Sequence, residues 1–241
     1  MPKWYNSQVV DIVNLTPHTK SFWLRIEDPD MFDYKPGQFI TLDLPIHEKR
    51  HKRWRSYSIA NLPRENGVIE LCIVSLEHGQ ATHYLFHELK IGDTIKFKGP
   101  DGGFILTDDM LDKELVMICT GTGVAPFRSM LLDLKSRNAF KKKVHLIFGT
   151  RRQEDILYQE DFSRLAIQEP HFTYTVTLSR EVNWPGDKGY VHPIYLSQYH
   201  KITEDRLFLI CGWSKMIDET VENLILKLGY DKSQVRYELY G

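Results

Sequence analysis

Cys119-Thr120-Gly121-Thr122-Gly123-Val124-Ala125-Pro126-Phe127 stands near the middle of the chain, between an apolar segment at residues 115–118 and an amphipathic one at residues 125–137. Glycines permit a tight turn and a close approach of backbone to a diphosphate, and the free N–H groups that begin a helix attract its negative charge. Pro126 suits a first helical turn. The stretch therefore predicts a dinucleotide-binding strand, turn and helix; a plain strand-to-helix connection is the alternative.

Strands and helices alternate from this stretch to the end of the chain. Apolar runs predict strands, and the amphipathic runs between them predict helices. Such alternation is typical of a parallel sheet covered by helices. We predict strands over residues 115–118, 144–148, 172–178, 206–210 and 235–240, and helices over 125–137, 161–167 and 214–228.

The chain before this stretch has a different pattern, in which short alternating strands are separated by turns. That pattern is typical of an antiparallel barrel. We predict strands over residues 9–13, 21–26, 38–44, 68–75 and 93–98, with one helix over 82–90. The 241 residues therefore divide into two domains, an N-terminal antiparallel β-barrel over residues 1–107 and an α/β, Rossmann-like domain with a parallel sheet over residues 108–241.

The composition excludes several classes of function. The 31 Lys and Arg residues nearly balance the 32 Asp and Glu residues, so no net field attracts nucleic acid or anionic lipid. The N-terminus lacks the apolar core of a signal peptide, and no apolar run approaches the roughly 20 residues that span a bilayer. We therefore expect a cytoplasmic protein without nucleic-acid or membrane partners. Cys72, Cys119, Cys211 and the 10 His lack ligand spacing, so no metal site is expected.

A second stretch with candidate binding residues is Arg55-Ser56-Tyr57-Ser58, at the start of a predicted barrel strand. It offers a guanidinium for phosphate, a flat aromatic ring for stacking and a hydroxyl for a hydrogen bond. Further on, Gly79-Gln80-Ala81-Thr82 starts the predicted helix, where Thr82 would cap and backbone N–H groups would hold a phosphate oxygen. Each residue alone also fits an exposed strand or an ordinary N-cap.

Five motifs follow one another along the chain, and their order is more specific than any one of them. They are Arg55 to Ser58, Gly79 to Thr82, Gly99-Pro100-Asp101-Gly102-Gly103-Phe104, Gly121 to Phe127 and Cys211-Gly212. In this order they resemble the ferredoxin:NADP reductase superfamily over nearly the whole chain. The resemblance implies a flavin-binding barrel that holds FAD, followed by an α/β domain that binds NAD(P)H.

The same resemblance implies which residues hold the flavin. Arg55 would bind its diphosphate, Tyr57 would lie against the isoalloxazine, and Ser58 would reach the reactive edge near N5. Backbone contacts would come from the next strand, and the start of the helix would assist the phosphate. The implied set is Arg55, Ser56, Tyr57, Ser58, Ile73, Val74, Ala81 and Thr82.

On the nicotinamide side, the resemblance implies a cradle formed by Thr120, Gly121, Thr122 and Gly123, with Cys211 and Gly212 beside the nicotinamide ring. Glu238 would lie near the hydride path, and Tyr240 would cover the flavin face until nicotinamide displaces it. The implied catalytic set is Ser58, Cys211, Glu238 and Tyr240. A buried, small hydrophobic role is the alternative for Cys211, and an exposed tail is the alternative for Tyr240, which Gly241 follows.

The choice between NADPH and NADH depends on basic side chains near the 2′-phosphate. Arg151 and Arg152 follow one predicted strand, while Ser179 and Arg180 follow another and resemble the Ser-Arg pair of NADPH-using relatives. Against this, the stretch at residues 184–192 resembles NADH-using oxygenase reductases and places Tyr190 where some NADPH users carry Arg. The sequence favours NADPH, with NADH as the alternative.

The chain has no cysteines for a fused iron–sulfur domain, so the electrons would leave to another molecule, such as a ferredoxin, a flavodoxin or an oxygenase component. An acidic partner would meet the basic residues between Lys49 and Arg55, although a solvated loop also explains them. Two other functions stay open. The chain would be a reductase that uses free flavin as its substrate, or a non-catalytic electron-transfer subunit of a larger complex.

Overall fold

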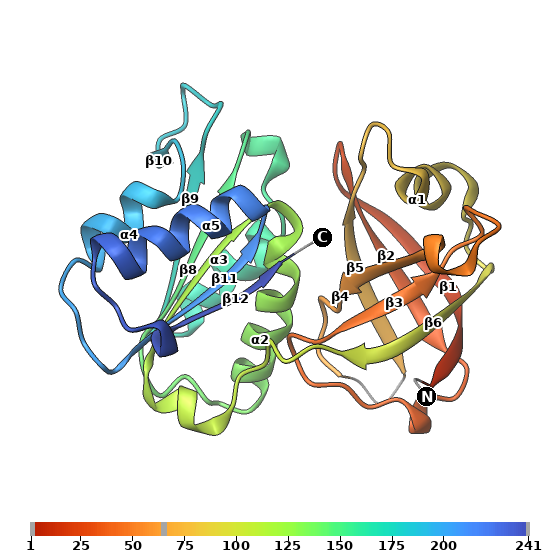
Figure 1. Cartoon of the computed structure of the whole chain (residues 1–241), viewed down its shortest axis with the longest axis horizontal. Helices are drawn as coiled ribbons and strands as arrows, with labels where there is room; N and C mark the ends of the chain where they lie inside the picture. The colour runs from red at the N-terminus through yellow and green to blue at the C-terminus, as the bar shows by residue number, and fades with distance from the viewer. Residues whose placement is uncertain (1–2, 64–66, 240–241) are drawn as a thin grey trace. The chain divides into compact units, whose positions relative to one another are not determined.

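The computed structural model describes residues 3–63 and 67–239 (Figure 1). The chain forms two compact units. Unit 1 comprises Met1–Ile105 together with Ala125–Asp133, and unit 2 comprises Leu106–Val124 together with Leu134–Gly241. Among the described residues, no helix combines the length and the apolar character that crossing a membrane requires.

Unit 1 is built on a six-stranded sheet with the order β4-β3-β6-β1-β2-β5, in which every strand pair is antiparallel. An antiparallel bridge between Ile59 and Leu71 joins the chain after β4 to β5, and so closes the sheet into a barrel. The strands are β1 (Trp4–Thr16), β2 (Thr19–Ile26), β3 (Phe39–Asp43), β4 (Trp54–Ser58), β5 (Val68–Val74) and β6 (Thr94–Asp101). The predicted antiparallel barrel is therefore confirmed.

Alternation of buried and exposed residues explains why these segments form strands. In β2, Phe22, Leu24 and Ile26 are buried in the barrel core, while Arg25 between them is exposed. The helix between β5 and β6 is short, with α1 (Gln80–His83) followed by one π-helical turn, η3 (Tyr84–Glu88). It starts two residues before the predicted range.

Unit 2 contains a second six-stranded sheet, with the order β10-β9-β8-β7-β11-β12 and only parallel pairs. The predicted parallel sheet is confirmed. Its strands are β7 (Glu114–Thr120), β8 (Val144–Thr150), β9 (Phe172–Leu178), β10 (Asp187–Lys188), β11 (Arg206–Gly212) and β12 (Val235–Leu239). Its helices are α3 (Gln159–Gln168), α4 (His192–Gln198) and α5 (Ser214–Glu222), which continues as the π-helical turn η7 (Asn223–Lys227). Helix α2 (Val124–Ser136) follows β7, and its residues Ala125–Asp133 belong to unit 1.

Helices α4 and α5 lie on one face of this sheet, as Figure 1 shows. Ile194 of α4 and Ile217 of α5 join one apolar cluster with Val116 of β7 and Phe208 of β11. The strand order reverses at β7, because β8 lies on one side of it and β11 on the other. Open α/β sheets bind ligands at such a switch point, outside the carboxyl ends of the strands.

One local prediction was wrong, and two elements were missed. The Arg55 to Ser58 motif lies in a barrel strand, as predicted, and occupies β4 from its second residue to its last. Thr82 is not the N-cap of α1; Gly79 is, and the Thr82 hydroxyl bonds back to the Gly79 carbonyl at 3.0 Å. The elements α4 and β10 were not predicted. Domain boundaries at 107 and 108 stay a prediction.

Candidate functional site

The glycine turn between β7 and α2 is packed against the end of β11. A Cβ atom at Gly123 would lie 2.4 Å from the carbonyl oxygen of Cys211 and 2.6 Å from Cα of Gly212. Gly121 adopts a left-handed backbone with φ of 53°, which L side chains rarely adopt. Lack of space therefore requires glycine at position 123, and the left-handed backbone favours glycine at position 121.

The end of β11 makes the reciprocal contacts with the end of β7. Gly212 has φ of 142°, and a Cβ atom there would lie 2.5 Å from Oγ1 of Thr120. The same Oγ1 accepts a hydrogen bond from the Trp213 backbone N–H at 3.3 Å. The structure thus brings Thr120, Gly121 and Gly123 together with Gly212 at the switch point of the sheet, as the sequence predicted for a dinucleotide cradle.

Cys211 lies fully buried beside Cys119, its register partner on β7. Burial raises the pKa of the Cys119 thiol well above its ordinary value, and the nearby Cys211 raises it further. Cys119 therefore stays a neutral thiol in the folded protein. On the other side of β11, Cys211 is in register with Glu238 of β12, which is half-buried. Tyr240, predicted to cover the flavin, lies outside the described residues.

The predicted 2′-phosphate residues lie together at the carboxyl ends of β8 and β9. The Ser179 backbone N–H donates to the Thr150 carbonyl at 3.0 Å, and the Arg180 N–H donates to the Arg151 carbonyl at 2.8 Å. These two bonds hold the loops side by side, with Arg151 and Arg180 both exposed. Tyr190, the residue that argued for NADH, is also exposed, at 72%, and lies close by, because Gly189 N–H donates to the Leu178 carbonyl.

In unit 1, strand β4 presents the predicted flavin residues at one edge of the sheet. Nη1 of Arg55 donates to the carbonyls of Lys52 at 3.0 Å and Trp54 at 2.7 Å, which hold the guanidinium near its own backbone. Burial raises the pKa of Tyr57 to about 12, an effect that the nearby Arg55 charge partly opposes. Ser56 is exposed, with its hydroxyl 3.0 Å from that of Thr41, and Ser58 is buried.

The other edge of the barrel sheet is β5, which carries Ile73 and Val74. On one side, the backbones of Ile73 and Val74 pair with β2. The described strand pairings give these two residues no partner on the other side, so their backbone groups there suit the predicted contacts to a ligand. Thr82 is buried, and its hydroxyl accepts from the Leu76 N–H at 3.1 Å. That hydroxyl therefore holds the turn before α1, and the first N–H groups near Ala81 are the better phosphate donors.

Sequence reasoning overlooked Trp213, which follows Cys211 and Gly212 and is 57% exposed. The signal was a large aromatic residue directly after the end of an apolar strand. The described side chains include no cluster of three or more histidines, cysteines or acidic residues placed to hold a metal ion.

Comparison with known proteins identifies the family. Residues 6–105 match the model of the oxidoreductase FAD-binding domain, and residues 117–222 match that of the oxidoreductase NAD-binding domain. A solved ferredoxin NADP+ reductase from Neisseria gonorrhoeae, with bound FAD and NADP, is 26% identical, and the match covers 100% of both chains with a TM-score of 0.82. The chain belongs to the ferredoxin:NADP reductase superfamily of FAD- and NAD-binding oxidoreductases.

Two relatives show how this pair of domains occurs in longer proteins. One subunit of the Na(+)-translocating NADH-quinone reductase of Idiomarina loihiensis is 30% identical, and the match covers 95% of this chain and 65% of that protein. The reductase component DmpP of phenol 2-monooxygenase from Pseudomonas sp. strain CF600 is also 30% identical, with 92% and 61% covered. The chain thus spans just under two thirds of the length of these relatives.

Proposed function

We propose that this chain is a FAD-dependent NAD(P)H oxidoreductase that passes electrons from NAD(P)H through bound FAD to a separate one-electron acceptor protein. The observation that carries the proposal is the interlocked pair of strand ends, in which Gly123 packs on Cys211 and Gly212 packs on Thr120 with no room for a Cβ atom. Such a close-packed glycine turn at a switch point suits a diphosphate. FAD, when bound, accepts a hydride and returns the two electrons one at a time.

The residues of unit 1 have distinct tasks in this proposal. Arg55 neutralises the flavin diphosphate, and the half-buried Tyr57 offers its ring face to the isoalloxazine. Because burial raises the pKa of Tyr57 to about 12, its phenol stays neutral and brings no negative charge to the flavin. Ser58 supplies a buried hydroxyl at the end of β4.

The residues of unit 2 bind and orient the nicotinamide dinucleotide. The turn over Thr120, Gly121, Thr122 and Gly123 holds the diphosphate with its N–H groups. Arg151 and Arg180 favour NADPH because both residues are exposed, and their backbones are hydrogen-bonded to each other beyond the carboxyl ends of β8 and β9. Glu238 lies beside Cys211 in register, where its carboxylate would act near the nicotinamide ring.

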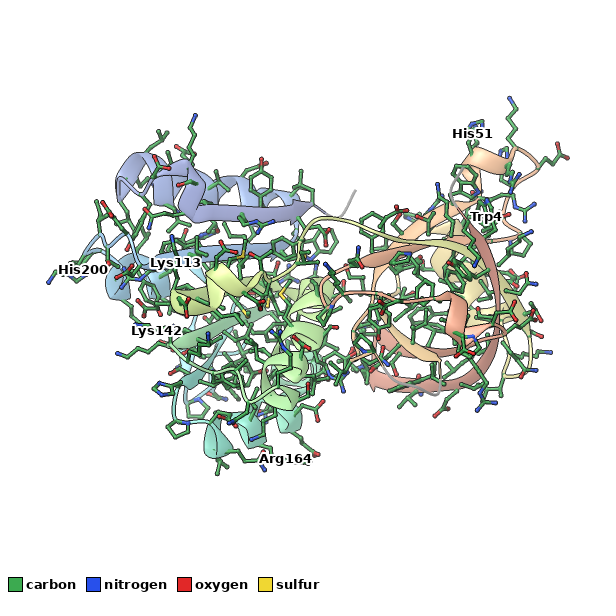
Figure 2. The ribbon with its side chains drawn as sticks, turned by 90° about the horizontal axis from the view of Figure 1, so that it is seen from below. Trp4, His51, Lys113, Lys142, Arg164 and His200 are labelled. Atoms are coloured by element: carbon green, nitrogen blue, oxygen red, sulfur yellow. The ribbon has the colours of Figure 1, made fainter. Side chains whose placement is uncertain are left out.

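For the partner, we propose an acidic redox protein that docks on a basic–aromatic cluster of unit 1. The Arg50 guanidinium lies 5.0 Å from the ring centre of Trp4, and Nζ of Lys98 lies 4.1 Å from that of Trp54. Figure 2 shows Trp4 and His51 at the outside of the barrel. Flat aromatic rings under cations match the composition of binding hot spots. Charge reversal by Arg50→Glu should slow the reduction of an acidic ferredoxin, mainly at low salt.

The residue roles are tested by Ser58→Ala in single-turnover reduction of the protein-bound flavin. The variant should reduce its flavin at least tenfold more slowly while its Kd for NADPH changes less than twofold, because the hydroxyl acts at the reacting edge rather than in nucleotide binding. Thr94→Ala, which removes an exposed hydroxyl on β6, is the matched control. An unchanged reduction rate in Ser58→Ala would remove Ser58 from the mechanism.

A further inference from the structure

Trp213 occupies an unusual position at the end of β11. It follows Gly212 directly, stands as the N-cap of α5 and has its backbone N–H hydrogen-bonded to Oγ1 of Thr120. The backbone is therefore fixed against the end of β7, while 57% of the residue surface stays exposed. An indole offers a flat apolar face and one N–H donor, and such residues are enriched where proteins bind their ligands and partners.

The indole lies against the glycine turn. A Cβ atom built on Gly121 would lie 3.6 Å from Nε1 of Trp213, and among the described residues beyond Gly121 and its two chain neighbours no other heavy atom lies within 4 Å of that position. The indole N–H edge is thus the neighbour of Gly121 on the side where a side chain would project. At that place the turn begins α2, whose first N–H groups attract an anion.

Within the described parts of the chain, Nε1 of Trp213 donates no hydrogen bond, and the residue bonds through its backbone N–H instead. Tryptophan N–H groups act only as donors, and they seek an acceptor when they are covered. The acceptor that fits this position is an anionic oxygen held at the glycine turn. The indole N–H of Trp213 and the backbone N–H groups of the turn would then donate to the same anion.

We propose that Trp213 is a dinucleotide-binding residue, whose Nε1–H donates a hydrogen bond to the diphosphate held at the turn formed by Gly121, Thr122 and Gly123. The inference rests on the proposed function, because it assumes that this turn binds NAD(P)H. It differs from the role of Arg180, which concerns the 2′-phosphate. Trp213 should therefore strengthen NADH and NADPH binding equally, and it should do the same for ADP-ribose, which keeps the diphosphate and lacks nicotinamide.

The test compares Trp213→Phe, which keeps a ring and removes the donor, with the wild-type holoenzyme in calorimetric titrations with ADP-ribose and with AMP. The Kd for ADP-ribose should rise at least about tenfold, as expected for one hydrogen bond to a charged group, while binding of AMP stays unchanged. Trp23→Phe, in unit 1, is the matched control and should bind both ligands like the wild type.

Fluorescence gives a second measurement that a purely structural role would not change. The chain has five Trp residues, and ADP-ribose should alter the emission of the wild type and of Trp23→Phe but not that of Trp213→Phe. An unchanged Kd for ADP-ribose in Trp213→Phe would overturn the proposal, as would equal losses for ADP-ribose and AMP. A wild-type protein that bound no ADP-ribose would instead refute the proposed function, and this inference with it.

Discussion

Replacing Gly123 with alanine tests whether the glycine turn is locked against the end of β11. The added Cβ would lie 2.4 Å from the Cys211 carbonyl oxygen and 2.6 Å from both the Cys211 carbonyl carbon and the Gly212 Cα. All three atoms belong to backbone, so no side chain can rotate away. The turn and the strand must therefore separate by about 1 Å, since ordinary contacts of a methyl group begin near 3.4 Å.

Overpacking of this kind costs about 1–3 kcal/mol and sometimes more. Because both partners are backbone, one in the turn after β7 and the other at the end of β11, we expect a loss near the upper end, about 3 kcal/mol in the free energy of unfolding. The same displacement moves the N–H groups of the turn, so the Kd for ADP-ribose should rise more than tenfold. Tight binding of FAD should persist, because the predicted flavin residues belong to unit 1.

Urea unfolding and calorimetric titration with ADP-ribose measure the two effects, and two further glycines calibrate them. Gly121→Ala meets no clash but has φ of 53°, so it should lose about 1 kcal/mol. Gly103→Ala has no neighbour within 4 Å and should stay within about 0.5 kcal/mol of the wild type. If Gly123→Ala matched Gly103→Ala in stability and in binding, the interlocked turn would be refuted.

Three further outcomes are expected. Arg180→Ala should weaken NADPH binding at least tenfold and NADH binding less than twofold, and equal losses would show that Arg180 does not contact the 2′-phosphate. Arg128→Met removes the guanidinium that pairs with the buried Glu70 carboxylate at 2.7 Å, so urea unfolding should show a loss of about 3 kcal/mol; a change below about 1 kcal/mol would contradict it. Burial lowers the pKa of His145 from 6.5 to about 4, so the unfolded chain binds the proton more readily between these values. The free energy of unfolding should therefore fall by up to about 3 kcal/mol as the pH drops from 6.5 to 4, and His145→Gln should lose that part of the pH dependence.

Strand positions were predictable where the hydrophobic pattern alone decided them. The predicted strands 68–75 and 172–178 correspond to β5 and β9 to within one residue, because both are runs of apolar or β-branched residues bounded by polar turns. Strand β1 begins five residues before its predicted start, since Trp4 to Gln8 pair with β6 without a clear apolar alternation. The pairing with β6 lengthens β1, and the local sequence does not reveal that pairing.

Tertiary contacts account for the elements that the sequence did not reveal. Helix α4 is only 7 residues long, and it is held by the Tyr195 hydroxyl, which lies 2.8 Å from Nδ1 of His192 and from Nδ2 of Asn223. Short helices gain most of their stability from such packing. The bond between Thr82 and Gly79 likewise replaced the predicted cap.

For the site, residue types and their order were informative, but contacts between distant segments were not. The motif at residues 119–127 predicted the turn, and the Cys211–Gly212 pair was expected at a strand end. The close packing of Gly123 on Cys211 required the order of β7 and β11 in the sheet. The position of the Trp213 indole over Gly121 depends on the same strand order, and so it was not predictable from local pattern.

An anaerobic absorbance titration of the purified protein, loaded with FAD, tests the central claim most directly. Stepwise addition of NADPH, and separately of NADH, should bleach the absorbance of the bound flavin near one equivalent of the preferred donor, and an added one-electron acceptor should restore it. A colourless protein that binds no added FAD, or a bound flavin that neither nucleotide bleaches, would contradict the account.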